Sequence, residues 1–518
     1  MKREPNLSSR WFANRASRSP LASTIGVFAI ALLVLTLTMN RTVGVYDEGL
    51  ILTGAARVAA GDHIHRDFYA NYGPAQFHLL ATLFNLFGSG VLTERLADIV
   101  IRASISAASW VALSGLCRRP IAAIGAGLIS AWLAFVGNHG YPVYPTLLLA
   151  LIATILLTRD DGASRRSLPA LLAGVLVGLA ALFRYDIGFM AAVAHMAGIL
   201  ITRRDARLHA ILTYAAGAAL PVLPLLAWYY ASGALGPFLH DTLTFPARFY
   251  VAMRGLPFPT PGLTKFSIYL PGIAVVLALI AWSRRRSAAD DKPRRFLLFF
   301  LLITLAFYLK GVGRVSIEHV QLALIPAIVL LTALSGDSQG RRRWLPYGAA
   351  LCLVITAINV GAAGQRKLGS SDAVVLEELS GFLSNPGEFK PEGAERGAAL
   401  AYIRDRTRPE DPLFVGLTRH DKIFVNDVSA YFLANRRPAT HWYHFDPGLQ
   451  TSAPIQRQMI ADLEASRPPV VWLESTWNDV REPNRSAESS GVRLLDDYLA
   501  AHYVAEATFG PIIIARRK

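Results

Sequence analysis

The sequence predicts a polytopic α-helical membrane protein of about 11 transmembrane helices with a small C-terminal α/β domain. Of the 518 residues, 53% are hydrophobic and only 17% are charged, and the mean hydropathy is +0.35. Long apolar runs fill most of residues 1–363, whereas residues 364–518 are more polar. This composition excludes an ordinary soluble enzyme and makes the bilayer the main solvent of the chain.

Charge indicates membrane topology rather than nucleic-acid binding, because the basic residues behind the net charge of +15 gather in short clusters between apolar runs. The first 20 residues are basic and precede an apolar run of spanning length that no small-residue cleavage site follows. We therefore expect an uncleaved first helix with a cytoplasmic N-terminus. Cys117 and Cys352 lie within or beside apolar segments, so neither a disulfide nor a thiolate metal site is expected.

A spanning helix needs about 20 mostly apolar residues, and several runs approach that length. With the N-terminus inside, the inside connections carry 22 Lys and Arg residues and the outside connections carry 10. The positive-inside rule supports this arrangement, and an odd number of spans places the C-terminal domain outside. The predicted spans are 21–39, 96–116, 120–136, 145–158, 168–183, 187–202, 208–230, 266–283, 296–309, 319–335 and 346–363.

Residues 364–518 alternate between strand-like and helical patterns, which is typical of a small α/β domain. The strand-like runs are "PLFVGL", "PVVWLES" and "GPIIIARR", and the helical patterns are "EGAERGAALAYIRDRT", "NDVSAYFLANRRP", "IQRQMIADLEASRP" and "VRLLDDYLAAHY". No glycine-rich phosphate loop opens any of these helices, so we expect no nucleotide site there. A structural or acceptor-docking role fits this domain best.

The first outside loop, residues 40–95, contains an acidic pair directly after the first span. Asp47 and Glu48 open the helical pattern "DEGLILTGAARVAAG", and "PAQFHLLATLFNLFGSG" suits a helix lying along the membrane interface. Acidic residues in a first turn are favourable to the helix dipole, which alone could explain the pair. A carboxylate near the hydrocarbon boundary is costly, however, so such residues are functional candidates.

Further polar and aromatic residues of this loop could form the wall of a cleft that contacts a sugar or an acceptor. His63 and His65, with Asp62 and Asp67, also suggest a weak divalent-cation site, since the H-x-H spacing carries little information in a loop. We predict no firm cofactor. The predicted wall residues are His63, His65, Asp67, Tyr69, Tyr72 and, from a later loop, Asp186.

The order of motifs resembles the GT-C superfamily of integral-membrane glycosyltransferases. A first span, an outside loop beginning "YDEG", then "GDHIHRDFYANYGP", "FHLLATLFNLFG" and the Arg-containing "ERLADIVIRA" carry the resemblance. The pattern is most similar to the bacterial branch related to protein mannosyltransferases and lipid A aminoarabinose transferases. The resemblance implies a sugar donor carried on a polyprenyl phosphate, with Asp47 as the catalytic base and Glu48 as its partner.

This chemistry is reasonable for the residues themselves, since a carboxylate can take the proton of an attacking hydroxyl and a single base gives inversion. Cations should meet the leaving phosphate at the outer helix ends. Each of them could instead snorkel to the interface or pair locally, as Arg184 with Asp186 or Arg314 with Glu318. The predicted phosphate-binding residues are Arg184, Arg248, Arg254, Lys310, Arg314 and His319.

The predicted function is transfer of a sugar to an envelope lipid, glycan or protein on the outer face of a bacterial inner membrane. Two other classes stay open. A transporter or flippase of a lipid-linked sugar would carry charges near the midplane and internal repeats, and no repeat is evident. A non-catalytic membrane scaffold would tolerate loss of Asp47. Membrane lipids are expected partners and nucleic acids are not.

Overall fold

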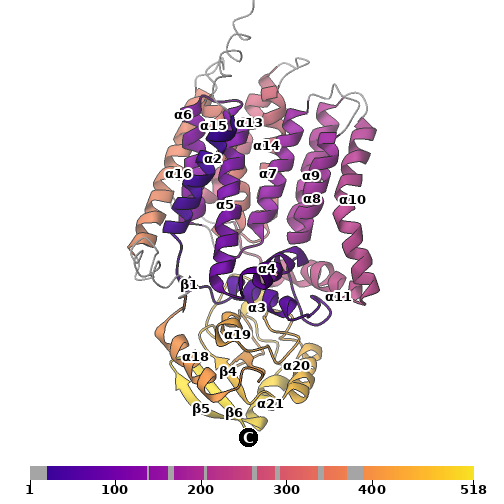
Figure 1. The fold of residues 1–518 in the computed structure, drawn as a ribbon, viewed down its shortest axis with the longest axis vertical. Helices are drawn as coiled ribbons and strands as arrows, with labels where there is room; N and C mark the ends of the chain where they lie inside the picture. The colour runs from indigo at the N-terminus through magenta and orange to yellow at the C-terminus, as the bar shows by residue number, and fades with distance from the viewer. Residues whose placement is uncertain are drawn as a thin grey trace, which may run out of the picture.

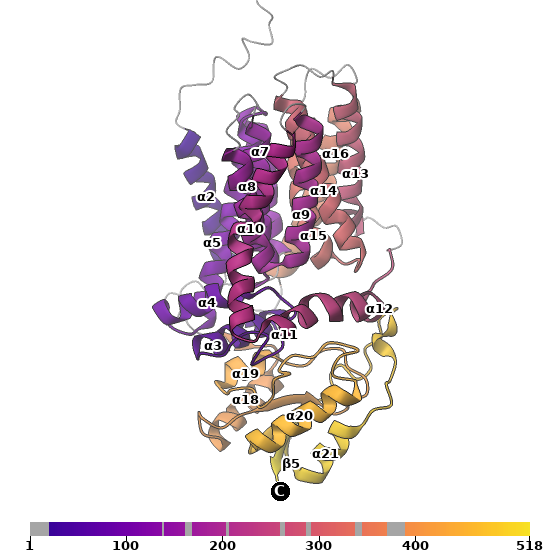
Figure 2. The same cartoon turned by 90° about the vertical axis from the view of Figure 1, so that its right-hand side faces the viewer.

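The computed structural model describes residues 20–136, 139–160, 168–203, 207–258, 265–285, 292–336, 344–369 and 389–518. The predicted cytoplasmic segment before residue 20 and parts of several basic connections lie outside the described residues. A bundle of long helices forms one end of the molecule and the C-terminal domain forms the other (Figure 1). A layer of short helices separates them, and Figure 2 shows the same three-part arrangement from the side.

Every predicted span is a helix, and its ends lie within a few residues of the predicted ones. Among the described residues, seven helices are long and apolar enough to cross a membrane, and α2, α6, α7 and α8 are apolar but shorter. The chain is therefore a multi-pass membrane protein. The bundle helices are α2 (Pro20–Leu37), α5 (Val91–Ser114), α6 (Arg119–Phe135), α7 (Val143–Arg159), α8 (Leu168–Phe183), α9 (Tyr185–Thr202), α10 (Arg207–Ala231), α13 (Phe266–Arg284), α14 (Lys292–Val312), α15 (Ile317–Ser335) and α16 (Trp344–Leu368).

Small residues let α8 and α10 pack closely in the bundle. A Cβ atom added at Gly174 or Gly178 would lie 2.1 or 2.3 Å from a backbone oxygen of α10, and one at Gly217 would lie 2.2 Å from a backbone oxygen of α8. Close backbone approach of this kind stabilises helix pairs in lipid, where apolar contacts alone give little preference for another helix. Any larger side chain at these glycines would push the two helices apart.

The first outside loop forms most of the short-helix layer. It contains β1 (Thr42–Val43), α3 (Asp47–Ala59) and α4 (Pro74–Phe87), so both predicted helices of this loop are present. Leu86 and Phe87 at the end of α4 are 68% and 74% exposed, which suits a helix at a membrane interface. The layer is completed by α11 (Leu235–Leu239), the π-helical turns η1 (His240–Thr244) and η2 (Pro246–Tyr250), and α12 (Val251–Arg254).

The C-terminal domain is a small α/β domain, as predicted. Its four-stranded sheet has the order β3-β4-β6-β5, in which β3 and β4 are parallel and the other pairs are antiparallel. The edge strand β5 was not predicted, because its residues are mostly exposed and no apolar run marks it. The elements are β2 (Lys390–Pro391), α18 (Ala394–Arg406), β3 (Phe414–Leu417), α19 (Ser429–Ala434), α20 (Ala453–Ser466), β4 (Val470–Glu474), η4 (Arg485–Ala487), α21 (Leu494–His502), β5 (Tyr503–Phe509) and β6 (Ile512–Arg517).

The C-terminal domain packs directly on the first outside loop. Strand β1 pairs in parallel with β2, and the backbone N–H of Ser429 donates to the carbonyl of Val45. A Cβ atom at Gly49 would lie 2.4 Å from the backbone nitrogen of Ser429, so α3 and α19 touch through their backbones. The loop that carries the acidic pair is therefore held between the bundle and this domain.

Candidate active site

Asp47 begins α3 at the surface between the bundle and the C-terminal domain. Its side chain is half-buried, and its Oδ1 accepts a hydrogen bond of 2.8 Å from the hydroxyl of Tyr72. Tyr46, the residue before the helix, makes no side-chain cap. Asp47 thus has the position in the first turn that the dipole argument requires, together with a specific partner from farther along the loop.

Glu48 points away from Asp47 into the protein. It is only 5% exposed, accepts the backbone N–H of Gly44 at 2.7 Å and pairs with Arg95 at 2.6 Å. Buried carboxylates need such partners to offset the loss of hydration. These contacts engage Glu48 in holding the start of α3 against α5.

Arg184, Asp186 and Lys310 form the first cationic group of the site. Arg184 makes two hydrogen bonds with Asp186, at 3.0 and 2.9 Å, and Lys310 lies 3.4 Å from the same carboxylate. Two cations thus share one anion. The guanidinium of Arg184 lies over the Tyr72 ring at 5.0 Å, which brings this group to Asp47.

Gly73 makes the approach of Tyr72 to this group possible. Its N–H donates to the carbonyl of Phe183 at 3.1 Å, and a Cβ atom there would lie 2.2 Å from the carbonyl oxygen of Leu182. Only glycine allows the loop to run so close to the end of α8, one residue before Arg184. The "NYGP" turn therefore positions both Tyr72 and, through it, Asp47.

The second cationic group joins the bundle side to the C-terminal domain. Arg254 donates to the carbonyl of Phe424 at 3.0 Å and to Asp446 at 3.3 Å. Arg314 donates to both oxygens of Glu482, at 2.9 and 2.8 Å, and to the carbonyl of Arg254 at 2.5 Å. Glu482, and not the nearby Glu318, is therefore the partner of Arg314.

We expect the Arg314–Glu482 pair to hold the C-terminal domain on the bundle. Arg314→Glu should weaken this docking by roughly 1–3 kcal/mol, because a bidentate, largely buried pair becomes a repulsive one. Limited proteolysis of the C-terminal domain measures the effect. The double variant Arg314→Glu with Glu482→Arg should restore resistance, and equal sensitivity of single and double variants would contradict the prediction.

Asp446 is a site residue that sequence reasoning missed. It accepts hydrogen bonds from the hydroxyls of Tyr46 and Tyr69, at 3.3 and 3.1 Å, and from the amide of Asn71 at 3.3 Å, besides the contact with Arg254. The stretch "HWYHFDPG" that contains Asp446 is as rich in His, aromatic and acidic residues as the first loop. That composition could have marked the stretch as a functional candidate. No pattern in the sequence, however, places this stretch against residues almost 400 positions earlier.

Tyr69 and Tyr72 contact the acidic residues of the site, whereas the other predicted wall residues of this loop do not. His65 is fully buried, pairs with Asp241 at 2.9 Å and packs against the rings of Tyr229 and Phe238. His63 packs on Trp228, and Asp67 forms an ion pair with Arg66. The contacts of these three residues stabilise the fold of the loop.

The two remaining predicted phosphate-binding residues, Arg248 and His319, have different surroundings. Arg248 is exposed on η2 and lies near His240. His319 is paired with Ser316 at 2.8 Å through Nδ1, while its Nε2 faces the Tyr250 hydroxyl at 3.5 Å. Lys310, Arg314 and Arg184 also lie near His319, so His319 borders both cationic groups.

The loop residues considered for a divalent cation do not fit one. Asp62 pairs with Arg57 and Arg437, and the imidazoles of His63 and His65 pack on different aromatic rings. Within the described ranges, no group of three or more His, Cys, Asp or Glu side chains is arranged to hold a metal. No step of the chemistry below is assigned to a metal ion.

The surroundings of Asp47 suit a general base. Burial raises the pKa of Asp47 above its ordinary value, while the Tyr72 hydrogen bond and the cations Arg254 and Arg184 oppose that rise. Burial also raises the pKa of Tyr72 well above its usual range, so Tyr72 stays a hydrogen-bond donor. A carboxylate with a raised pKa is, in its ionised form, a stronger proton acceptor.

Tyr72→Phe should move the acid limb of the activity profile to higher pH. The variant loses a hydrogen bond that favours the ionised carboxylate, so the pKa of Asp47 rises further and the base form is lost earlier on acidification. We expect the ratio of the transfer rate at about pH 6 to that at about pH 8 to be roughly 2–10-fold lower in the variant than in the unsubstituted protein. Tyr498→Phe, a remote buried control, should leave the profile unchanged, and an identical profile for both variants would remove Tyr72 from this role.

No protein-family model and no curated protein matches the sequence. Among solved structures, ArnT from Cupriavidus metallidurans bound to undecaprenyl phosphate has a TM-score of 0.60 at 14% identity, covering 96% of this chain and 98% of that chain. Its apo state has a TM-score of 0.58 with the same identity and coverage. The apo oligosaccharyltransferase of Archaeoglobus fulgidus has a TM-score of 0.51 at 11% identity, covering 90% of this chain and 70% of that chain.

Both neighbours belong to the GT-C superfamily, and the alignments extend over the helical bundle, the first outside loop and the C-terminal domain. The resemblance predicted from the loop motifs is thereby confirmed at the level of the fold. The chain is a multi-pass membrane protein with the GT-C fold.

Proposed function

We propose that the chain is a membrane glycosyltransferase that moves a sugar from a polyprenyl-phosphate carrier to a hydroxyl of an envelope lipid, glycan or protein. One observation carries the proposal: the Asp47 carboxylate, held by Tyr72, lies beside Arg184, which shares Asp186 with Lys310. A proton acceptor and a cationic site next to each other are what this transfer requires. The solved complex of ArnT with undecaprenyl phosphate supports the carrier class.

In the proposed reaction the acceptor hydroxyl oxygen attacks the anomeric carbon of the donor sugar. Its proton passes to Asp47, whose Oδ2 is the proposed acceptor atom because Tyr72 occupies Oδ1. The bond between the anomeric carbon and the phosphate oxygen breaks, and the electron pair leaves with the polyprenyl phosphate. Arg184 and Lys310 stabilise that developing charge, after which Asp47 returns its proton to solvent.

Inversion of the anomeric centre follows from the carboxylates around Asp47. Retention would call for a second carboxylate acting as nucleophile. Asp186 is already shared by two cations, and Asp446 already accepts bonds from Tyr46, Tyr69 and Asn71. Neither is the free nucleophile that a retaining mechanism would use.

The proposed mechanism uses no metal. The oligosaccharyltransferase of Archaeoglobus fulgidus has been solved in complex with Zn and sulfate, but in this chain the loop residues considered for a cation contact other side chains: Asp62 and Asp67 pair with arginines, His65 pairs with Asp241, and His63 packs on Trp228. Full transfer by the purified protein in excess chelator is the expected result. A requirement for an added divalent cation would overturn this part of the proposal.

The proposed location is the bacterial inner membrane, with the N-terminus cytoplasmic and the domain of residues 364–518 outside. The charge bias of the connections supports this orientation. In the structure, α16 continues to Leu368, a few residues beyond the proposed boundary. A reporter fused after Lys518 should be exposed on the outer face, and a cytoplasmic signal would reverse the assignment.

Mass spectrometry of envelope lipids in a strain without the protein tests the proposed function directly. A polyprenyl-phosphate sugar should accumulate on the outer face, and its mass gives the class of the sugar. Accumulation on the inner face would favour a flippase instead. Restoration of the normal lipid profile by an Asp47→Asn variant would favour a non-catalytic scaffold.

A further inference from the structure

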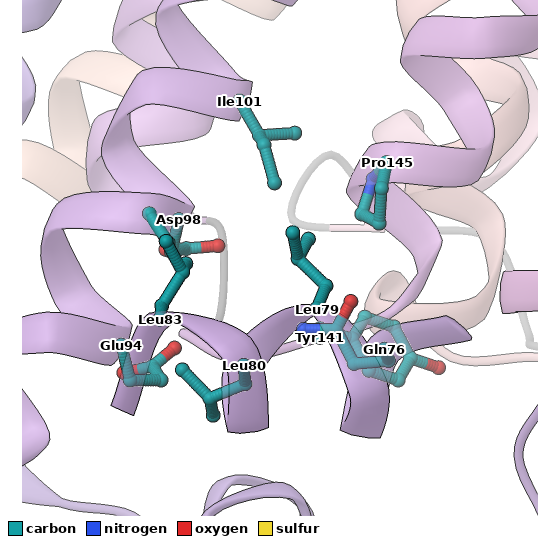
Figure 3. Close-up of a pocket in the computed structure, with 10 residues that line it drawn as sticks. Gln76, Leu79, Leu80, Leu83, Glu94, Asp98, Ile101, Tyr141 and Pro145 are labelled. Carbon is teal, nitrogen blue, oxygen red and sulfur yellow. The ribbon is translucent and has the colours of Figure 1, made fainter. Parts of the chain in front are cut away.

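A groove between α4, α5 and the start of α7 lies beside the proposed active site. Figure 3 shows its lining, in which the carboxylates of Glu94 and Asp98 on α5 lie near Leu79, Leu80 and Leu83 of α4. Its interior is narrow, with space for a group the size of one water molecule. The lining residues are Gln76, Leu79, Leu80, Leu83, Glu94, Ala97, Asp98, Ile101, Tyr141 and Pro145.

Two side chains in the groove are buried hydrogen-bond acceptors without a hydrogen-bond donor among the described residues. Glu94 is 2% exposed and both of its carboxylate oxygens lack a hydrogen bond, although Arg95 Nε lies 3.5 Å away. Gln76 is 8% exposed and its Oε1 also lacks a partner. Buried acceptors in native proteins nearly always receive a hydrogen bond, and the described residues supply none to these oxygens of the groove.

The neighbouring cations do not donate hydrogen bonds to Glu94 or Gln76. Arg95 directs its Nη2 to Glu48 at 2.6 Å and to the Thr42 carbonyl at 3.0 Å, and its Nε, 3.5 Å from Glu94, forms no hydrogen bond with that carboxylate. Asp98, the other carboxylate of the groove, is already paired with Arg102 at 2.6 Å and with His139 at 3.1 Å. The group that Glu94 and Gln76 lack is therefore a hydrogen-bond donor, such as a hydroxyl or an ammonium.

The apolar residues of the groove, which come from both α4 and α5, face outward. Leu79 is 37% exposed, and Leu83, Ala97 and Ile101 are half-buried. Because α5 is one of the bundle helices, this side of the groove opens toward lipid. A ligand that suits this groove has an apolar chain to lie along the leucines and a hydrogen-bond donor at the end of that chain.

Tyr141 connects the groove to the proposed base. It lines the groove, and its ring packs edge-on against that of Tyr72 with centroids 6.4 Å apart. Tyr72 in turn donates to Asp47. A hydroxyl-bearing amphiphile that enters along α4 is thus delivered next to the residue that would deprotonate it.

We propose that this groove binds the head of an amphiphilic acceptor, with Glu94 and Gln76 accepting hydrogen bonds from its hydroxyl or ammonium group. The acceptor assignment rests on the proposed function, whereas binding of a donor-headed amphiphile does not. Among the envelope acceptors considered above, this favours a lipid or lipid-linked molecule that diffuses in the bilayer. Glu94 and Gln76 are specificity-determining residues in this proposal.

A cysteine-protection experiment on the full chain in nanodiscs tests the binding step. Cys117 and Cys352 are both buried, so a thiol introduced by Leu83→Cys reports the groove above a low background. We expect 1-dodecanol and dodecylamine to slow its alkylation by a maleimide, and dodecyl methyl ether, which has no donor, to do so at least about 10-fold less effectively. Leu86→Cys, 68% exposed on the same helix, is the control and should show no protection.

Gln76→Leu and Glu94→Leu, each added to Leu83→Cys, should raise the half-protective concentration of 1-dodecanol about 10-fold or more. Gln76 lies outside the ion-pair network, so its variant keeps the test valid if Glu94→Leu fails to fold. Equal protection by the alcohol and the ether, or protection that survives both substitutions, would show that Glu94 and Gln76 do not bind a donor head group and would overturn the proposal.

An activity measurement separates this proposal from the proposed function. Leu83→Trp, which fills the groove, should raise the KM for a lipid acceptor while leaving binding of polyprenyl phosphate unchanged. An unchanged KM would contradict the groove assignment and leave the glycosyltransferase proposal intact. Full sugar transfer by an Asp47→Asn variant would contradict the proposed mechanism and leave the groove assignment unaffected.

Discussion

Asp47→Asn is expected to reduce sugar transfer by roughly 10²–10⁴-fold, the usual contribution of a positioned general base. Asparagine has the size of aspartate and can still accept the Tyr72 hydrogen bond, so the geometry of the site is kept. What it cannot do is take a proton from the attacking hydroxyl. Transfer from a polyprenyl-phosphate sugar by the purified variant in nanodiscs is the measurement.

The rival explanation for Asp47, stabilisation of the α3 dipole, predicts a different result. Loss of one charge at a helix N-terminus costs about 0.3–1 kcal/mol of stability and nothing in chemistry. Asp497 is a matched control, because it is an exposed acidic residue in the first turn of α21. If Asp47→Asn and Asp497→Asn both keep full activity with slightly lower thermal stability, the base assignment is wrong and the dipole account holds.

Arg184→Gln is expected to produce the second large loss, about 10²–10³-fold in kcat/KM for the donor. The variant removes one of the two cations around Asp186 and the stacking contact with Tyr72. The remaining Lys310 is then neutralised by Asp186, so little positive charge is left for the phosphate. Titration of polyprenyl phosphate and steady-state kinetics together show whether binding or the chemical step is lost.

Arg248→Gln is the matched control for this experiment. Arg248 is a cation on the same side of the molecule, but it is exposed and lies near His240 rather than Asp186. We expect its loss to change kcat/KM for the donor by less than about twofold. An equal loss in both variants would indicate a diffuse electrostatic effect and contradict a phosphate site built on Arg184.

The helical bundle and the acidic pair could be predicted because the sequence patterns that indicate them extend over only a few neighbouring residues. Each span needs only a run of apolar residues, and α3 begins at Asp47 because an apolar helical pattern starts there. The same reasoning predicted the strands β3, β4 and β6, which are buried in the domain core. It missed β5, whose exposed edge position leaves no apolar pattern to detect.

The candidate site was harder to predict because its groups come from distant parts of the chain. Tyr46 and Asp446 are 400 residues apart and meet through a hydrogen bond, and Arg314 pairs with Glu482 rather than with its sequence neighbour Glu318. Partner choice among charged residues depends on distance and burial, which a linear pattern does not contain. For the same reason the sequence grouped His65 and Asp67 with Tyr72, although the fold turns them in different directions.

The sequence by itself determined that this is a membrane protein with a loop of GT-C character, because hydropathy and short motifs act over a few residues. The tertiary structure decided which charges work together. It directs Asp47 to Tyr72 and Glu48 to Arg95, although the two are adjacent, since consecutive residues of a helix point about 100° apart. It also brings Asp446 of the C-terminal domain to Tyr69 of the first outside loop. This contact depends on how the whole domain packs on α3, which no short stretch of sequence specifies.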